Sequence, residues 1–187
     1  MNIVFLSSNP DKKRQVQRIF EGSEISLSFV DNNEPEIQGE NSREIALFAA
    51  QKYAMEHQVI TVREDHSLYL NYLYPFPGPY LAYFDRKMEV DKLLQIYENA
   101  TDRTGFFLLE AAVAFPNGIM RCYSHKVPIK LATAKSDGEG NFDRILILEN
   151  EDLTFAEKKN LTIPSSPIWA QNYVNIYNDI LQGKVKG

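Results

Sequence analysis

A short apolar run followed at once by a helix-start signal constrains the fold most strongly. Ile3–Leu6 is apolar, and the next residues read Ser7-Ser8-Asn9-Pro10. Asparagine is favoured as a helix N-cap, and proline suits the first helical position. Val16, Ile19 and Phe20 then recur at helical spacing. The chain therefore opens as a strand, a turn and a helix.

The following segments continue the alternation of strands and helices. Ile25–Val30 alternates apolar residues with serine, as a half-buried strand does. The sequence Asn41-Ser-Arg-Glu is typical of a capping box and predicts a helix that extends to about His57. Val59–Val62 is typical of a buried strand that ends before Arg63. These segments indicate an α/β protein.

The second half of the chain combines further helices with an antiparallel region. Three prolines and a glycine in Tyr74–Tyr80 predict an irregular, rigid turn. The Asn117-Gly118 pair predicts a hairpin between two apolar runs, and so an antiparallel lobe over about residues 104–150. Helices are expected from Leu81, over Val90–Tyr97 and over Ile168–Leu181, and strands over Lys126–Ala132 and Arg144–Leu148. With no linker or repeat in between, we expect one domain, residues 1–187, with a mixed, elongated sheet.

Composition excludes several classes of protein. The net charge is −5, and no basic block is present, so a nucleic-acid polymer is not an expected partner. No stretch approaches the ~20 apolar residues of a membrane span, which favours a cytoplasmic protein that does not bind membranes. Cys122 is the single cysteine, and the three histidines lack the spacing of a zinc site. Any metal ion is therefore expected to bind oxygen ligands.

The basic residues at the first helix allow two interpretations. Exposed backbone N–H groups at a helix start bind anions, and Lys12 and Lys13 would add positive charge, which suggests a phosphate ligand. Alternatively, Lys12, Lys13 and Arg14 form a solvated helix face, as runs of surface charge often do.

Acidic residues where the predicted strand ends also allow two interpretations. Glu64 and Asp65 follow Val59–Val62, and ligands of open α/β sheets bind at such carboxyl ends. The pair can hold Mg²⁺ or deprotonate a water molecule, with Glu36 as a third candidate. Alternatively, the two residues are solvated loop acids.

In this order, the segments resemble the inosine triphosphate pyrophosphatase family, which hydrolyses non-canonical purine nucleoside triphosphates to monophosphate and pyrophosphate. The resemblance covers about residues 1–160. Five short motifs carry it: Ser7-Ser8-Asn9-Pro10-Asp11-Lys12, Pro35-Glu36, Glu64-Asp65-His66-Ser67-Leu68, Phe76-Pro77-Gly78-Pro79-Tyr80 and Asp102-Arg103-Thr104-Gly105.

The resemblance implies an enzyme and a role for each matching residue. Glu36 and Asp65 would organise Mg²⁺, and Asp65 with Glu64 would align or deprotonate the attacking water. The implied substrate contacts are Ser8, Asn9, Lys12, Lys52, Phe142 and Asp143. Hydrolysis at a phosphoryl centre depends on charge neutralisation and positioning, which a metal ion and a lysine supply.

Two departures from the family motivate a second hypothesis. The family's lysine in the second helix falls on Ala49, so Lys52, three residues on, is the candidate replacement. The family's later Ser-His-Arg is absent, and residues 163–171 read IPSSPIWAQ. The alternative is therefore a catalytically silent homologue that binds a nucleotide or a protein partner.

The resemblance also implies architecture and assembly. It implies two lobes around a long mixed sheet flanked by helices, with the substrate in the cleft between them. Family members are homodimers, and the aromatic segment Phe76–Phe84 is the candidate for supporting a two-fold interface. Alternatively, these aromatic residues fill the core.

Overall fold

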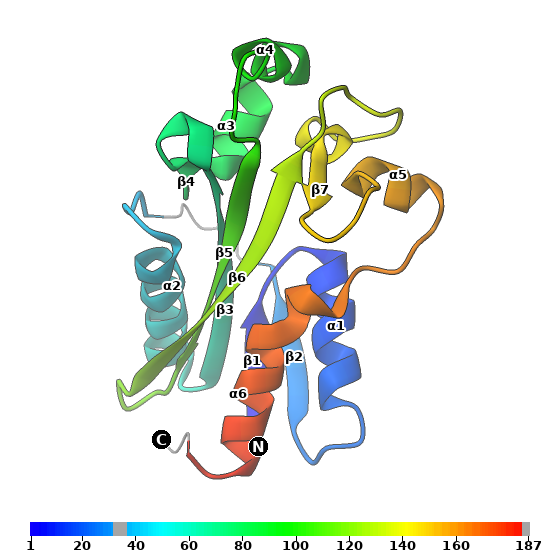
Figure 1. Cartoon of the computed structure of the whole chain (residues 1–187). Coiled ribbons are helices and arrows are strands. Elements are labelled where there is room, and N and C mark those ends of the chain that lie inside the picture. Colours follow the sequence, from blue (N-terminus) through cyan, green and yellow to red (C-terminus); the bar gives the residue numbers. More distant parts are fainter. Residues whose placement is uncertain (32–36, 185–187) are drawn as a thin grey trace. The chain divides into compact units, whose positions relative to one another are not determined.

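The computed structural model describes residues 1–31 and 37–184 and has an α/β fold with a seven-stranded mixed sheet (Figure 1). The strand order is β2-β1-β3-β5-β6-β7, and β4 pairs with β3. Strand β1 is parallel to β2 and β3, whereas the β3–β4 and β6–β7 pairs are antiparallel. The strands are β1 Asn2–Leu6, β2 Ser26–Val30, β3 Ile60–Leu70, β4 Phe76–Gly78, β5 Thr104–Ala114, β6 Met120–Leu131 and β7 Leu146–Leu148. The expected α/β class with a mixed sheet is confirmed.

The helices begin close to where the sequence signals place them. Asn9 caps α1, and its side chain accepts hydrogen bonds from the backbone N–H groups of Asp11 and Lys12. Asn41 caps α2 by accepting from the N–H of Glu44, at 3.0 Å. The α-helices are α1 Pro10–Phe20, α2 Ser42–His57, α3 Leu81–Lys87, α4 Val90–Ile96, α5 Phe155–Asn160 and α6 Gln171–Leu181. Three short 3₁₀ helices cover Asn71–Leu73, Phe142–Arg144 and Pro167–Ala170. No described helix combines the length and apolar character needed to cross a bilayer.

The chain divides into two compact units. The first contains Met1–Asp65, Leu109–His125 and Pro167–Gly187, and the second contains His66–Leu108 and Lys126–Ser166. The hairpin of residues 109–125 groups with the first unit, and the single domain with an antiparallel lobe over about 104–150 stays a prediction. Strands β3, β5 and β6 are long enough, at 11, 11 and 12 residues, to contribute to both units.

The core of the first unit has a different composition on each face of the sheet. On one face, α1 packs against α6, and large residues such as Phe5, Phe20 and Tyr173 form one buried cluster. On the other face, α2 contributes three buried alanines that pack against Ala112 and Ala114 of β5. Alternate residues of β5 therefore serve opposite faces, as strand geometry requires. Small side chains let α2 lie close to the strand.

Three predicted elements are wrong in their extent. The strand expected over Val59–Val62 runs from Ile60 to Leu70, so Glu64 and Asp65 lie within it and not beyond its end. The turn expected over Tyr74–Tyr80 contains β4, which pairs with β3. The apolar run expected after the Asn117-Gly118 turn and the strand expected over Lys126–Ala132 belong to one continuous β6. Polar residues in β3 interrupt the apolar pattern that would predict a strand. Glu64 is tolerated inside β3 because residues distant in the sequence form hydrogen bonds to its carboxylate.

In the second unit, the Asp102–Gly105 segment has structural contacts. The Arg103 guanidinium donates to the carbonyl oxygens of Leu131, at 3.1 Å, and Tyr97, at 2.8 Å, and also bonds the carbonyl of Ala132. A Cβ added at Gly105 would lie 2.5 Å from the backbone oxygen of Tyr69, so only glycine fits. This motif thus ties strand ends together.

Candidate functional site

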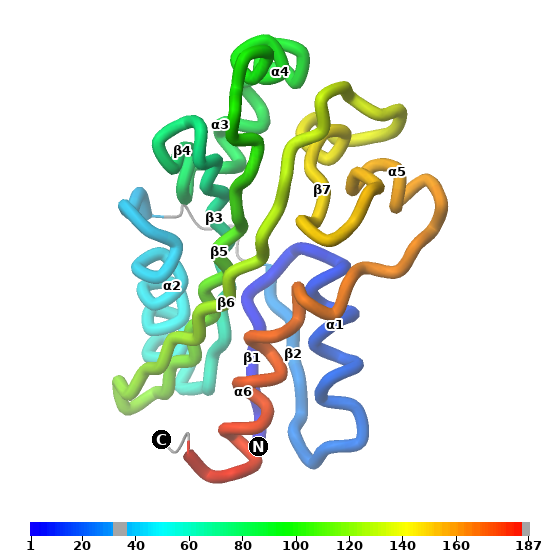
Figure 2. Tube along the Cα trace, in the orientation of Figure 1, coloured from blue at the N-terminus to red at the C-terminus, as the bar shows by residue number. Residues whose placement is uncertain are grey.

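The end of β1 leads directly into α1 and creates the first part of the site. The trace in Figure 2 passes from β1 into α1, and Ser7, Ser8 and Asn9 are the three residues between the two elements. Asn9 Oδ1 accepts from the N–H groups of Asp11, at 2.8 Å, and Lys12, at 3.3 Å. The chain itself therefore uses these two donors, and an anion here would depend on the lysine side chain more than on the helix start. Ser8 is exposed.

Lys12 forms an ion pair with the buried carboxylate of Glu64. The distance from Lys12 Nζ to Glu64 Oε2 is 3.3 Å, and the ammonium also donates to the Glu64 backbone oxygen at 3.5 Å. The side chain of Lys12 is 18% exposed and that of Glu64 is 2% exposed. The pairing of β1 with β3 ends at Leu6 and Arg63, so Glu64 is the first β3 residue past the end of β1. This position lets Lys12 reach it from α1.

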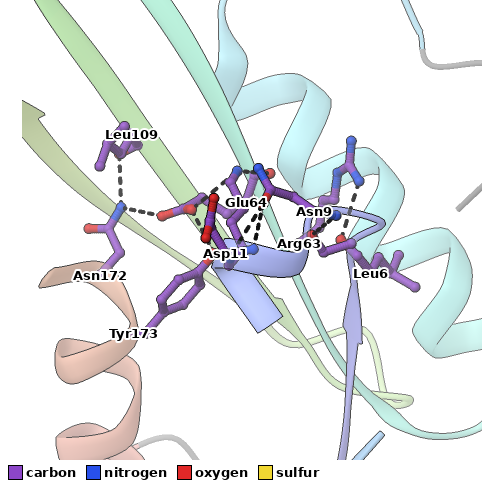
Figure 3. Close-up of polar contacts among 10 residues, drawn as sticks. Leu6, Asn9, Asp11, Arg63, Glu64, Leu109, Asn172 and Tyr173 are labelled. Atoms are coloured by element: carbon purple, nitrogen blue, oxygen red, sulfur yellow. Dashed lines mark hydrogen bonds and ion pairs between the residues drawn. The ribbon is translucent and has the colours of Figure 1, made fainter. Parts of the chain in front are cut away.

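Two residues at the start of α6 also contact Glu64 (Figure 3). The phenol of Tyr173 donates to Glu64 Oε2 at 2.6 Å. The amide of Asn172 reaches Glu64 Oε1 at 3.5 Å and donates to the backbone oxygen of Leu109 at 3.0 Å. Burial and the Glu64 charge raise the pKa of Tyr173 well above its usual value, so the phenol stays protonated and donates.

Sequence reasoning misses Asn172 and Tyr173. Their helix carries tyrosines that the sequence assigns to the core, and Tyr173 is indeed buried within the apolar cluster. Its hydroxyl lies against a carboxylate that is 109 residues away in the sequence. No local pattern signals such a pair.

The three cations of the basic run have different surroundings. Lys12 turns inward to Glu64, so it is not part of a solvated face. Lys13 pairs with Asp31 at 2.7 Å, with the aspartate side chain 56% exposed, and Arg14 pairs with Asp11 one turn back. Of the three cations, Lys12 is the one held in a buried setting.

Glu64 and Asp65 are neighbours on a continuous strand, so their side chains project to opposite faces of the sheet. In Figure 3, Glu64 points toward Asn172 and Tyr173 of α6, whereas Arg63 donates to the backbone oxygen of Leu6. Asp65 is half-buried. Neither acid is a solvated loop residue. Both lie past the last β1–β3 pair, Leu6 and Arg63, so β1 does not separate their side chains at this end.

The proposed metal ligands are described only in part, because Glu36 lies outside the described residues. Among residues 1–31 and 37–184, no three His, Cys, Asp or Glu side chains gather in a way that could hold a metal ion. Mg²⁺ often takes only one or two protein carboxylates and completes its shell with water and substrate phosphates. The carboxylate oxygens of Asp65 are of the type that this ion prefers.

A small cavity of about 10 Å³ adjoins the ion pair. Ser7, Lys12, Glu64 and Tyr173 are among the residues that line it. The volume is roughly that needed for one water molecule. The charge of Glu64 also acts on His125, in the same unit. Burial lowers the pKa of His125, and the Glu64 charge partly opposes this shift.

Three further predicted contacts lie elsewhere in the structure. Lys52 is exposed on α2, in the first unit. In the second unit, Phe142 is 3% exposed and packs against Phe84, with ring centroids 5.2 Å apart. Asp143, next to it, forms an ion pair with Lys159. Their roles toward a substrate stay predictions.

Known proteins resemble this chain in sequence and in fold. The sequence profile described as the Ham1 family matches residues 3–161. Two similar proteins are named dITP/XTP pyrophosphatase. The one from Thermococcus kodakarensis is 28% identical over 84% of this chain and 85% of its own, and the one from Korarchaeum cryptofilum is 30% identical over 83% of each. The solved structure of the Staphylococcus aureus Ham1 protein, at 21% identity, covers 99% of this chain and all of its own, with a TM-score of 0.77.

The profile match spans most of the chain, including β1, α1, α2 and β3 with Lys12 and Glu64. The solved structure supports the same fold over nearly the whole length. The resemblance inferred from the five motifs is thereby confirmed, and the chain belongs to the Ham1 family.

Proposed function

We propose that this protein is a hydrolase that splits nucleoside triphosphates into the monophosphate and pyrophosphate. The observation that carries the proposal is the ion pair between Lys12, from the first turn of α1, and the buried Glu64 just past the end of β1. Similar proteins of matching length that bear the name dITP/XTP pyrophosphatase support it. A fixed lysine of this kind binds phosphate oxygens and neutralises charge that develops during their transfer.

Mg²⁺ is the cofactor that we propose, held by Asp65 and Glu36 together with the triphosphate. When bound, the ion supplies neutralisation of phosphate charge and a template for the leaving pyrophosphate. Asp65 accepts the proton of the attacking water, and Lys12 holds a phosphate oxygen. Glu64 is buried and bonded by Lys12 and Tyr173, so it serves this reaction by holding Lys12.

We further propose that non-canonical purine triphosphates are the preferred substrates. The names of the similar proteins specify dITP and XTP. The base would meet the segment around Phe142 and Asp143. A site that pairs a 6-oxo purine rejects other bases when its own buried donors lose their partners.

The test measures pyrophosphate release from dITP, XTP, dATP, GTP and CTP with Mg²⁺, and again with the metal chelated. We expect turnover of dITP or XTP that depends on Mg²⁺. Asp65→Asn is expected to lose it, and Asp31→Asn, which changes an exposed acid of the same unit, is expected to retain it. Binding of a nucleotide without turnover would favour the silent homologue, and turnover without metal would exclude the proposed cofactor.

We also propose that the protein forms a homodimer through the aromatic segment Phe76–Phe84. Phe84 is buried against Phe142, whereas Phe76, Tyr80 and Tyr83 are 46%, 45% and 59% exposed. Exposed aromatic side chains close together favour association. Sedimentation of the dilute protein should show a dimer that Tyr83→Ala weakens, and a monomer at every micromolar concentration would refute the proposal. The cytoplasmic location and the absence of a nucleic-acid partner stay predictions.

A further inference from the structure

We propose that Asn172 and Tyr173 of α6 are positioning residues, which act through Glu64 to fix the Lys12 ammonium against the triphosphate. The inference rests on the proposed function and deepens it. It assigns Glu64 to the support of a substrate-binding cation, and it gives the C-terminal helix a part in the reaction.

The carboxylate of Glu64 is buried, and its side chain is 2% exposed. A carboxylate taken out of water is costly unless charged or polar donors surround it. Such donors surround Glu64, because Tyr173 and Lys12 meet Oε2 while Asn172 reaches Oε1. The phenol contact, at 2.6 Å, is the shortest of these, as expected for a hydrogen bond to a charged acceptor.

The two donors on α6, Asn172 and Tyr173, are held in place by other contacts. Asn172 is fully buried, and its amide also donates to the backbone oxygen of Leu109 on β5, so α6 is tied to the sheet at this point. The Tyr173 ring lies edge-on against Phe5 of β1, with centroids 6.0 Å apart. Both side chains that hold Glu64 are thus fixed by contacts of their own.

The ammonium of Lys12 is positioned by Glu64. A lysine has three N–H donors. One of them donates to the backbone oxygen of Glu64 at 3.5 Å, and the ammonium lies 3.3 Å from the carboxylate as an ion pair. A phosphate oxygen would approach from the partly exposed side of Lys12. A displaced Glu64 would therefore turn the ammonium, and a misplacement of about 1 Å costs roughly 100-fold in rate.

The experiment compares Tyr173→Phe with Tyr123→Phe. Tyr123 is a matched control, since its phenol donates to Asp179 of the same helix at 3.0 Å and burial raises its pKa to about 12. With XTP as substrate, we expect kcat/KM to fall about 10- to 100-fold in Tyr173→Phe. We expect little change in Tyr123→Phe, although both variants lose a tyrosine–carboxylate hydrogen bond.

The double variant separates positioning from a purely structural effect. A residue that acts through Glu64 has no further effect once Glu64 has lost its charge, whereas a residue that only stabilises the fold keeps its effect. Glu64→Gln keeps the shape of the side chain, and we expect Glu64→Gln with Tyr173→Phe together to lose no more than Glu64→Gln alone.

The outcomes are distinct. An active wild type in which Tyr173→Phe and Tyr123→Phe have equal kcat/KM overturns the inference and leaves the proposed function standing. No turnover by the wild type on any triphosphate removes both. If Tyr173→Phe does not fold, full activity in Glu64→Gln overturns the inference.

Discussion

The ion pair of Lys12 and Glu64 should couple more strongly than the neighbouring pair of Lys13 and Asp31, although its atoms lie farther apart. The distances are 3.3 Å and 2.7 Å respectively. The test is a double-mutant cycle for each pair, with Lys12→Met and Glu64→Gln in one, and Lys13→Met and Asp31→Asn in the other. Adjacent lysines of one helix make the two cycles closely matched.

Burial determines the expected magnitudes. Breaking a fully buried ion pair costs about 3–5 kcal/mol, and exposed pairs contribute about 0–1 kcal/mol. Glu64 is 2% exposed, but Lys12 is 18% exposed, and the carboxylate keeps two other donors in the single variant. We therefore expect a coupling free energy of about 1.5–3 kcal/mol for the first pair. For Lys13 and Asp31, 28% and 56% exposed, we expect less than about 1 kcal/mol.

The assay is urea unfolding followed by the fluorescence of Trp169, the single tryptophan, which lies in the same unit as both pairs. Raising the salt concentration should weaken the Lys13 pair and leave the Lys12 pair nearly unchanged. Equal coupling in the two cycles, or stronger coupling for Lys13, would refute the argument that burial and not distance determines the strength of the pair.

Three further predictions concern other parts of the chain. Burial, as the main cause, and a hydrogen bond to a buried glutamate, as the second, raise the pKa of the Cys122 thiol to about 12. At pH 8 this thiol should therefore react with a disulfide reagent about 1,000-fold more slowly than an ordinary cysteine. Fast reaction of the folded protein would contradict this prediction. Gly105→Ala places a Cβ 2.5 Å from a backbone oxygen and should lower the free energy of unfolding by more than about 2 kcal/mol. Gly118→Ala has open space and only a positive φ to accommodate, so it should lower the free energy of unfolding by about 1–2 kcal/mol. A larger loss for Gly118→Ala than for Gly105→Ala in urea unfolding would contradict the packing. Burial lowers the pKa of His125, so the unfolded chain binds the proton more readily and the free energy of unfolding should fall as the pH drops below about 6.5. His125→Gln should flatten this pH dependence, and His57→Gln should leave it unchanged. The same dependence of the free energy of unfolding on pH in both variants would refute the prediction.

Local signals in the sequence are enough to predict one side of the site. The cap at Asn9 and the helix that follows depend on adjacent residues, and the structure places them as expected. The order of the five short motifs along the chain likewise indicates the family. Lys12 is therefore identifiable as a candidate from its position in the first helical turn.

The other side of the site depends on contacts between distant segments. Local pattern places Glu64 beyond a strand end, because a charged residue inside a buried strand violates the usual alternation. Its stabilising partners are 108 and 109 residues away on α6. Hydrophobic periodicity describes which face of a helix is buried, but not which hydroxyl on that face meets a charge.

The most direct measurement of the central claim is the identity of the products that the purified wild-type protein forms from XTP and Mg²⁺. Chromatography of the quenched reaction should show the monophosphate and pyrophosphate in equal amounts, with no diphosphate. Formation of the diphosphate and inorganic phosphate, or unchanged XTP, would contradict the account.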